Sequence, residues 1–208
     1  MTESKGQATK SNILKEGLIL ASVQGLVNIS IGGLAEKAQM SRSGLFAHFM
    51  SKEQLQLEIL EYAHELFHDT VIKPASALPS PKERLQFLAE QLPIWYDVSA
   101  PPIPGGCIFL TACIEFDDRP GKVKDYLMNV QKTFLDFLTT NHNGAVEMGQ
   151  FTGRISDDDF AFVFYSFYLG YHQYKKFFGD KNARQYCRTH LDGLIGFCTG
   201  DHPALQNL

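Results

Sequence analysis

The first fifty residues contain three short runs in which hydrophobic side chains recur every three or four positions, as on one face of a helix. Ser30 and Ser41 precede the second and third runs, and serine caps a helix by accepting a hydrogen bond from its free amides. Gln39 and Met40 lie between those runs and leave room only for a tight turn. The pattern predicts three helices with these apolar faces: Ile13, Leu14, Gly17, Leu18 and Ala21; Ile31, Leu34, Ala35 and Ala38; Leu45 and Phe49.

The remaining chain continues the helical pattern. A long stripe predicts one helix over residues 52–72, and a capped start at Ser80 predicts another that Pro93 should kink. Further helices are predicted over 122–138, with a break at 141–144, over 157–178 and over 181–198. Residues 107–116 are apolar almost all round, which indicates a buried segment, and composition alone also allows a strand there. We expect a helix, because every neighbouring element is helical, and hence an all-α fold.

Two short helices joined by so tight a turn are typical of a helix-turn-helix, which places its second helix in the major groove of DNA. With Leu45 and Phe49 facing inward, four side chains are left on the other faces of that helix: Arg42, Ser43, Phe46 and His48. An arginine here can donate to guanine edges or to phosphate, and Lys52 is placed to neutralise a phosphate. A plain amphipathic three-helix unit would explain the caps and the spacing equally well.

A longer ordered pattern favours the DNA-binding interpretation. It reads Ser30-Ile31-x-x-Leu34-Ala35-x-x-Ala38-x-Met40-Ser41, followed by Ser43-Gly44-Leu45-Phe46-x-His48-Phe49-x-x-Lys52-Glu53-x-Leu55. This segment resembles the DNA-binding domain of the tetracycline-repressor (TetR) family of transcription regulators. The resemblance implies a helix-turn-helix DNA-binding domain over residues 1–50. A long helix would join it to a helical effector-binding and dimerisation domain over residues 51–208.

The resemblance also supplies candidate contacts with double-stranded operator DNA. They are Ser30, Ser41, Arg42, Ser43, Gly44, Phe46, His48 and Lys52. Members of the family often carry tyrosine at the position of Phe46, where its hydroxyl contacts phosphate, and phenylalanine cannot make that bond. The last two helices resemble the family's four-helix dimer interface, so we expect a homodimer that reads a palindromic operator.

The same resemblance predicts an apolar pocket for a small hydrophobic effector whose identity the sequence does not give. Its expected lining is Trp95, Phe109, Cys113, Phe116, Tyr126, Phe134, Tyr165, Tyr168 and His172. Effector binding would move the long helix and release the operator, so the expected function is that of a ligand-responsive repressor. The alternative is a regulator of the same fold in which Cys107 or Cys113 acts as a redox switch.

Charge is divided unevenly along the chain. The net charge is −4, yet residues 1–55 hold six basic and four acidic side chains, which is +2 and leaves −6 for the rest. This division suits a DNA-reading end and a ligand-binding end. The four cysteines show no C-x-x-C spacing, and we interpret them as small buried hydrophobes in a reducing compartment.

Several other classes of protein are disfavoured. No apolar run approaches the roughly 18 residues of a membrane span, and the N-terminus lacks the apolar region of a signal peptide, so we expect a cytoplasmic protein. His64 and His68 lie one turn apart without a third metal ligand, and Ser156 followed by three aspartates is typical of a helix start. Without a nucleophile elbow, phosphate loop or catalytic triad, neither an enzyme nor a cofactor is predicted.

Overall fold

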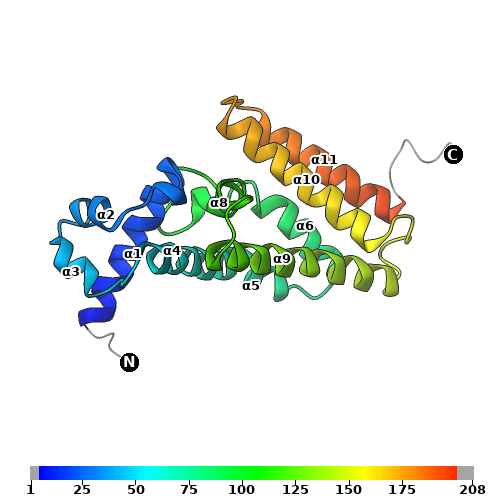
Figure 1. Cartoon of the computed structure of the whole chain (residues 1–208). Helices are drawn as coiled ribbons and strands as arrows, with labels where there is room; N and C mark the ends of the chain where they lie inside the picture. The colour runs from blue at the N-terminus through cyan, green and yellow to red at the C-terminus, as the bar shows by residue number, and fades with distance from the viewer. Residues whose placement is uncertain (1–4, 201–208) are drawn as a thin grey trace. The chain divides into compact units, whose positions relative to one another are not determined.

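In the computed structural model, which describes residues 5–200, every regular element among those residues is a helix (Figure 1). This confirms the predicted all-α fold. The elements are α1 (Lys5–Gln24), η1 (Leu26–Asn28), α2 (Ile31–Lys37), α3 (Arg42–Phe46), α4 (Lys52–Phe67), η2 (His68–Ile72), α5 (Lys73–Ser76), α6 (Pro81–Gln91), α7 (Trp95–Val98), α8 (Ile108–Phe116), α9 (Lys122–Glu147), α10 (Asp157–Lys176) and α11 (Ala183–Thr199).

The helices form two compact units. The first unit comprises residues 5–67 together with Tyr96–Val130, and the second comprises His68–Trp95 together with residues 131–200. Most of the helices have both buried and exposed faces. In the described part of the chain, none of them combines the length and apolarity that a membrane crossing needs.

In the first unit, α1 packs on α4 and α2, and α8 packs on η1, α1 and α4. Gly17 permits the close approach of α1 to α4, because a side chain there would stand 2.9 Å from Ile59. The segment before α8 approaches α1 even more tightly. The Gly105 amide donates to Ser22 Oγ over 3.0 Å, and a Cβ atom on Gly105 would overlap the Ser22 carbonyl group.

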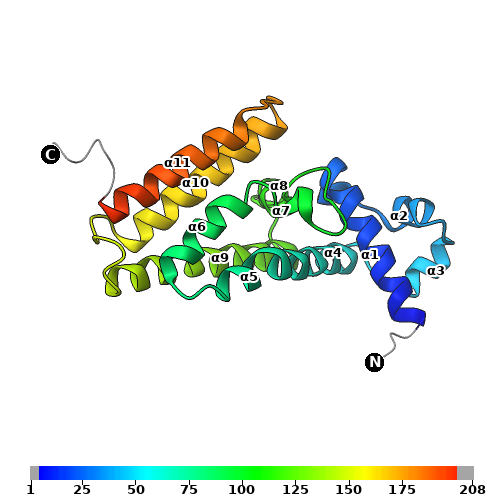
Figure 2. The same cartoon turned by 180° about the vertical axis from the view of Figure 1, so that it is seen from behind.

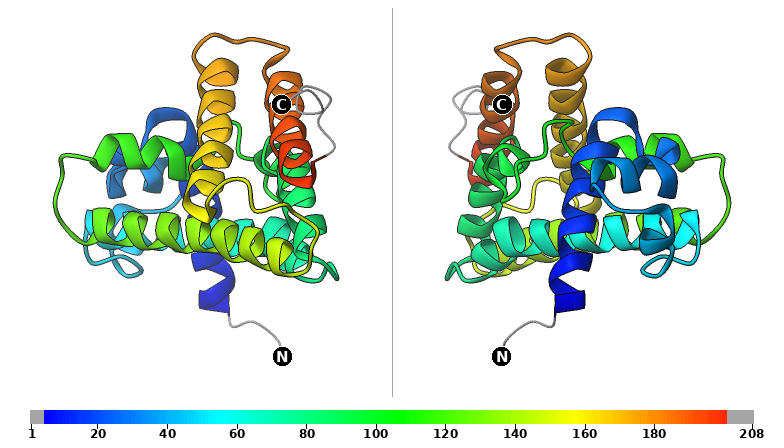
Figure 3. Two further views of the ribbon diagram at one scale, coloured as in Figure 1. Left: turned by 90° about the vertical axis from the view of Figure 1, so that its right-hand side faces the viewer. Right: turned by 90° about the vertical axis from the view of Figure 1, so that its left-hand side faces the viewer.

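In the second unit, α10 and α11 run side by side, as both the rear view and the end views show (Figures 2 and 3), and α11 also packs on α6. Aromatic side chains from α9 and α10 fill the unit. The ring of Phe160 packs on Phe164 with their centroids 5.8 Å apart, and both side chains are fully buried. Aromatic rings bury large areas, so this cluster supplies much of the unit's apolar stabilisation.

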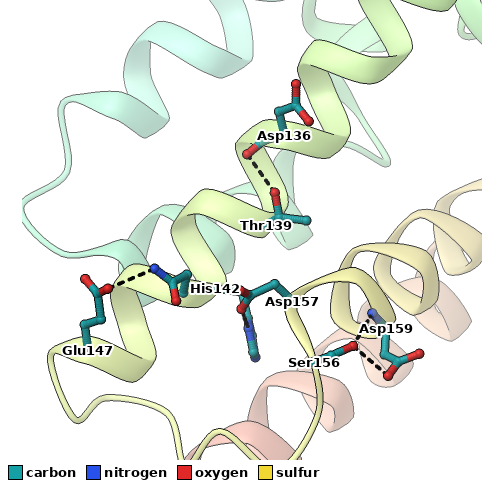
Figure 4. Close-up of polar contacts among 8 residues, drawn as sticks. Asp136, Thr139, His142, Glu147, Ser156, Asp157 and Asp159 are labelled. Carbon is teal, nitrogen blue, oxygen red and sulfur yellow. Dashed lines mark hydrogen bonds and ion pairs between the residues drawn. The ribbon is translucent and has the colours of Figure 1, made fainter.

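The predicted break at residues 141–144 was wrong, because α9 continues without interruption through that segment. Long-range contacts hold Asn141 and His142 in place within the helix. Asn141 receives a hydrogen bond from Arg84, and the buried ring of His142 stacks on Phe160 while its Nδ1 lies 2.6 Å from Asp157 Oδ1 (Figure 4). Gly144 lets α9 approach Pro81, which a Cβ atom would contact at 3.1 Å.

The kink predicted at Pro93 also needs correction, whereas Pro74 lies at the start of a helix. The helical path after α4 continues through the π-helical turn η2 into α5, where Pro74 occupies the first turn and needs no backbone donor. Pro93 does not kink a longer helix, because α6 already ends at Gln91. The segment 107–116 forms helix α8, as expected. Ser80 and Glu83 form the predicted capping box of α6.

We expect Gly105→Ala to destabilise the protein by about 1–3 kcal/mol or more, because the added methyl group forces the Ser22 backbone to move. The matched control is Gly6→Ala in the first turn of α1, where nothing lies within 4 Å of the new Cβ atom. Alanine has the better helix propensity, so this control should be neutral or stabilising by up to about 1 kcal/mol. Thermal and denaturant unfolding measure both changes, and equal effects would contradict the proposed close contact.

Candidate functional site

Helices α2 and α3 form the predicted helix-turn-helix. Ser30 Oγ accepts from the Gly33 amide over 3.1 Å, and Ser41 Oγ accepts from the Gly44 amide over the same distance. Gln39 has a φ of 54°, the left-handed conformation that a tight reversal requires of one residue. Both caps and the turn are therefore confirmed where the sequence placed them.

Buried and exposed residues separate cleanly on α3 and just after it. Leu45 and Phe49 are fully buried, as predicted, although α3 itself ends at Phe46. Arg42 and Ser43 are exposed, and Phe46 exposes 54 % of its surface despite being apolar. The exposed side of α3 therefore offers a cation, a hydroxyl and an aromatic ring, which are groups that contact phosphate, base edges and thymine methyl groups.

Gly32 in α2 explains how Arg42 is accommodated. An added Cβ atom on this glycine would stand 3.3 Å from Arg42 Nε, so the arginine side chain lies directly against the glycine backbone. Two adjacent glycines, Gly32 and Gly33, are unusual in so short a helix, because each costs about 1 kcal/mol relative to alanine. The contact gives Gly32 a role in orienting Arg42.

The residues around the start of α4 make more contacts with protein than the sequence suggested. Lys52 Nζ donates to the Val27 carbonyl over 2.6 Å, and Lys10 forms an ion pair of 2.6 Å with Glu58. Ser51 Oγ accepts from the Gln54 amide over 3.1 Å and so caps α4. An ammonium group has three donors, so a phosphate contact by Lys52 stays a prediction.

Four of the residues predicted to bind an effector lie in the first unit. The buried ring of Phe109 meets His64 and Phe67 in edge-to-face contacts, with centroids 6.3 Å and 6.4 Å away. The hydroxyl of Tyr126 lies 3.5 Å from His64 Nδ1. Burial, together with Glu61 and Glu65, raises the Tyr126 pKa to about 12, so its phenol stays a hydrogen-bond donor. Phe116 is buried and Cys113 is half-buried.

The other five predicted effector residues lie in the second unit. Trp95 Nε1 donates to the hydroxyl of Tyr168 over 2.9 Å, and both side chains are buried. Tyr165 donates to Gln131 Oε1 over 3.0 Å, and its ring lies 6.3 Å from that of Phe134. These pairs order the aromatic rings through their polar ends. That all nine residues line one effector site stays a prediction.

His172 differs from these residues because one of its ring nitrogens lacks a hydrogen-bond partner in the described structure. Its side chain is only 8 % exposed, and its Nε2 has no hydrogen-bond partner among the described residues. Burial, followed by the positive charges of Lys176 and Lys175, lowers the His172 pKa from 6.5 to about 4. The imidazole is therefore neutral at physiological pH, and a neutral imidazole offers one donor and one acceptor.

The four cysteines fall into two groups. Burial raises the thiol pKa of Cys187 to about 12 and that of Cys198 to about 11, so both are poor nucleophiles. Cys107 is buried and Cys113 is half-buried. A redox role for these two stays a prediction. Among residues 5–200, no group of three or more His, Cys, Asp or Glu side chains is arranged to hold a metal ion.

The capped helix-turn-helix and the helical domain that follows it define a DNA-binding transcription regulator of the helix-turn-helix class. Two family models match the chain. The model for bacterial regulatory proteins of the tetR family covers residues 13–59, and that for the tetracyclin repressor-like C-terminal domain covers residues 81–191. The chain therefore belongs to the TetR family, whose members are transcription factors and not enzymes. This confirms the resemblance drawn from the sequence.

Several solved structures share this fold. A TetR-family regulator from Cytophaga hutchinsonii is 19 % identical, with a TM-score of 0.80 over 94 % of this chain and 97 % of its own. AibR, in complex with isovaleryl coenzyme A and operator DNA, is 23 % identical, with a TM-score of 0.72 over 92 % and 98 %. A putative regulator from Saccharomonospora viridis in complex with choline is 20 % identical, with a TM-score of 0.74 over 92 % and 96 %. At this identity they show the fold alone. No curated protein sequence matches the chain significantly.

The low pKa of His172 predicts an acid-sensitive fold. Because the folded pKa of about 4 lies below the ordinary 6.5, the unfolded chain binds the proton first as pH falls. This contribution to stability is complete above pH 6.5 and is lost progressively towards pH 4. We expect His172→Gln to flatten the fall in unfolding free energy over that range, measured by denaturant titration at stepped pH. Gln173→Ala, at the exposed next residue, is the control, and an unchanged slope in His172→Gln would refute the assignment.

Proposed function

We propose that this chain is a ligand-responsive repressor that binds a palindromic operator as a homodimer and is released by a small hydrophobic effector. The observation that carries this proposal is the exposure of Arg42 and Ser43 on one side of α3. The other side is fixed in the core by the buried side chains of Leu45 and Phe49. The proposed DNA contacts are those predicted from the sequence, with Arg42 as the principal one. Since operators are genomic DNA, we also infer a cytoplasmic location.

A single recognition helix reads too few base pairs for useful specificity. A two-fold dimer would place two copies of α3 about 34–36 Å apart, one turn of DNA, and so would read a palindrome. The proposed operator is therefore a pair of inverted half-sites. Affinity for it should fall with rising salt, because cationic side chains displace counterions from the phosphates they neutralise.

The surface proposed for dimerisation is a groove between α10 and α11. We call it the α10–α11 groove, with a volume of about 470 Å³ and the lining Ser166, Phe167, Gly170, Tyr171, Tyr174, Asp180, Ala183, Tyr186, Cys187 and His190. Large aromatic side chains stay exposed beside it, including Phe177 at 75 % and Phe178 at 63 %. Exposed apolar surface of this kind is typical of association sites, and the proposed occupant is a second copy of the chain.

The effector proposal rests on the buried polar groups of the second unit. Trp95 Nε1 donates to the Tyr168 hydroxyl, whereas His172 Nε2 has no hydrogen-bond partner in the described part of the chain. Apolar walls with a few placed polar groups are the usual construction of small-molecule sites. The complexes of AibR with isovaleryl coenzyme A and of the Saccharomonospora viridis regulator with choline support a small-molecule effector on this fold. Release requires that the effector prefer the conformation that does not bind DNA.

Arg42→Ala should weaken operator binding by about 1–3 kcal/mol, roughly fivefold to 150-fold, because Arg42 would donate to bases or phosphate. The probe is a fragment enriched by the wild-type protein from sheared genomic DNA, and the readout is fluorescence anisotropy across a salt series. The control is Arg154→Ala, at an exposed arginine of the second unit. Equal affinity of Arg42→Ala and wild type would contradict the contact. Failure of the wild-type protein to enrich any DNA, even after refolding to strip bound effector, would refute the proposal itself.

Gly170→Arg should convert the dimer to a monomer and lower operator affinity. The new side chain meets nothing within 4 Å at its Cβ atom within one chain but projects from the lining of the α10–α11 groove. Gln173→Arg adds the same charge at an exposed position of α10 that does not line the groove, so it serves as the control. Sedimentation equilibrium measures the association, and circular dichroism checks the helix content. A dimer that persists in Gly170→Arg would exclude this groove as the interface.

A further inference from the structure

The short helix η1 connects α1 to the helix-turn-helix and thereby fixes where α2 begins. Its first residue, Leu26, and the following Ile29 are buried, so the segment is anchored in the core of the first unit. One residue later Ser30 caps α2. Any displacement of η1 therefore moves the start of α2, and with it the turn that carries α3.

Side chains that are distant in sequence hold the backbone of η1 from two helices. Glu115 of α8 accepts from the Val27 amide with its Oε2 over 2.9 Å. Lys52 of α4 donates to the carbonyl of the same residue over 2.6 Å, and the buried Gln56 donates to the Leu26 carbonyl over 2.9 Å. The backbone of Val27 is thus bonded on both sides. Its N–H donates to the Glu115 carboxylate, and its C=O accepts from the Lys52 ammonium group.

The chain makes room for the carboxylate at Gly25. This residue has a φ of 90°, which favours glycine, and a Cβ atom there would overlap an oxygen of Glu115. A second contact from the same part of the chain, the bond from the Gly105 amide to Ser22 Oγ, ties the segment before α8 to the end of α1. Helix α8 and the segment leading into it are therefore fastened to the DNA-binding helices at two points.

We propose that Glu115 is a positioning residue for operator binding, acting through the Val27 amide to hold η1 and hence α2 and α3 in the DNA-reading arrangement. The inference rests on the DNA-binding role of the proposed function. Through this hydrogen bond, α8 controls the position of the helix-turn-helix without any movement of α4. A conformational state that withdraws α8 would loosen η1 and lower operator affinity.

Two substitutions separate the hydrogen bond from the charge. Glu115→Asp keeps the charge but shortens the side chain, so the carboxylate no longer reaches the Val27 amide. Glu115→Gln removes the charge but keeps a carbonyl oxygen that accepts the same bond. We expect Glu115→Asp to weaken operator binding about tenfold, as loss of a bond to a charged acceptor implies, and Glu115→Gln to stay within about threefold of wild type. Asp118→Ala, which removes an exposed carboxylate just after α8, should have no effect.

The DNA probe is the genomic fragment enriched by the wild-type protein, and hydrogen exchange at the Val27 amide is read in parallel without DNA. Glu115→Asp should speed exchange at Val27 while leaving the amides in the middle of α1 and α4 protected. Equal affinity of Glu115→Asp and wild type would overturn the inference, as would equal losses in Glu115→Asp and Glu115→Gln. If the wild-type protein enriches no DNA, the proposed function fails, whereas the exchange result still reports whether Glu115 holds η1.

Discussion

Burial of two side chains behind a five-residue helix is the constraint on which the DNA-reading end depends. A helix as short as α3 gains too little from its own hydrogen bonds to repay the cost of starting it, so tertiary contacts must hold it. Leu45 and Phe49 provide those contacts, and the Ser41 cap satisfies one of the amides left open at its first turn. The helices α1, α2 and α4 of the first unit can be understood as the support that keeps these two side chains buried.

The second unit uses polar groups differently. Its core is aromatic, and the polar ends of those rings are matched in pairs, as in the bonds from Trp95 to Tyr168 and from Tyr165 to Gln131. Such pairs fix the orientation of rings that apolar packing alone leaves free to slide. His142 and His172 stand apart, since each keeps a buried nitrogen without a hydrogen-bond partner among residues 5–200. A buried nitrogen without a hydrogen-bond partner destabilises the fold, so each such nitrogen calls for a functional explanation.

Features that depend on neighbours in sequence were predictable, whereas features that depend on distant neighbours were not. The caps at Ser30 and Ser41 and the turn at Gln39 need only residues two or three positions away, and the structure has them where the sequence placed them. The break expected at 141–144 failed because Arg84, Asp157 and Pro81 stabilise that stretch of α9 from elsewhere in the chain. In the candidate site, the spacing of the hydrophobic residues was enough to predict which face of α3 is exposed. The bond of Lys52 to Val27 and that of Glu115 to the same residue were not, because no local pattern marks them.

The division of α3 into a buried and an exposed side also bears on how such a protein changes its target. Leu45 and Phe49 carry the folding requirement, while Arg42, Ser43 and Phe46 contribute little to the core. Substitutions on the exposed side therefore leave the fold largely intact, and a library varied only at those three positions would consist mostly of folded proteins. Selection from such a library can therefore change which DNA sequence the protein binds without changing the rest of the fold. Gly32 sets one limit, because a larger residue there would crowd whatever side chain replaces Arg42.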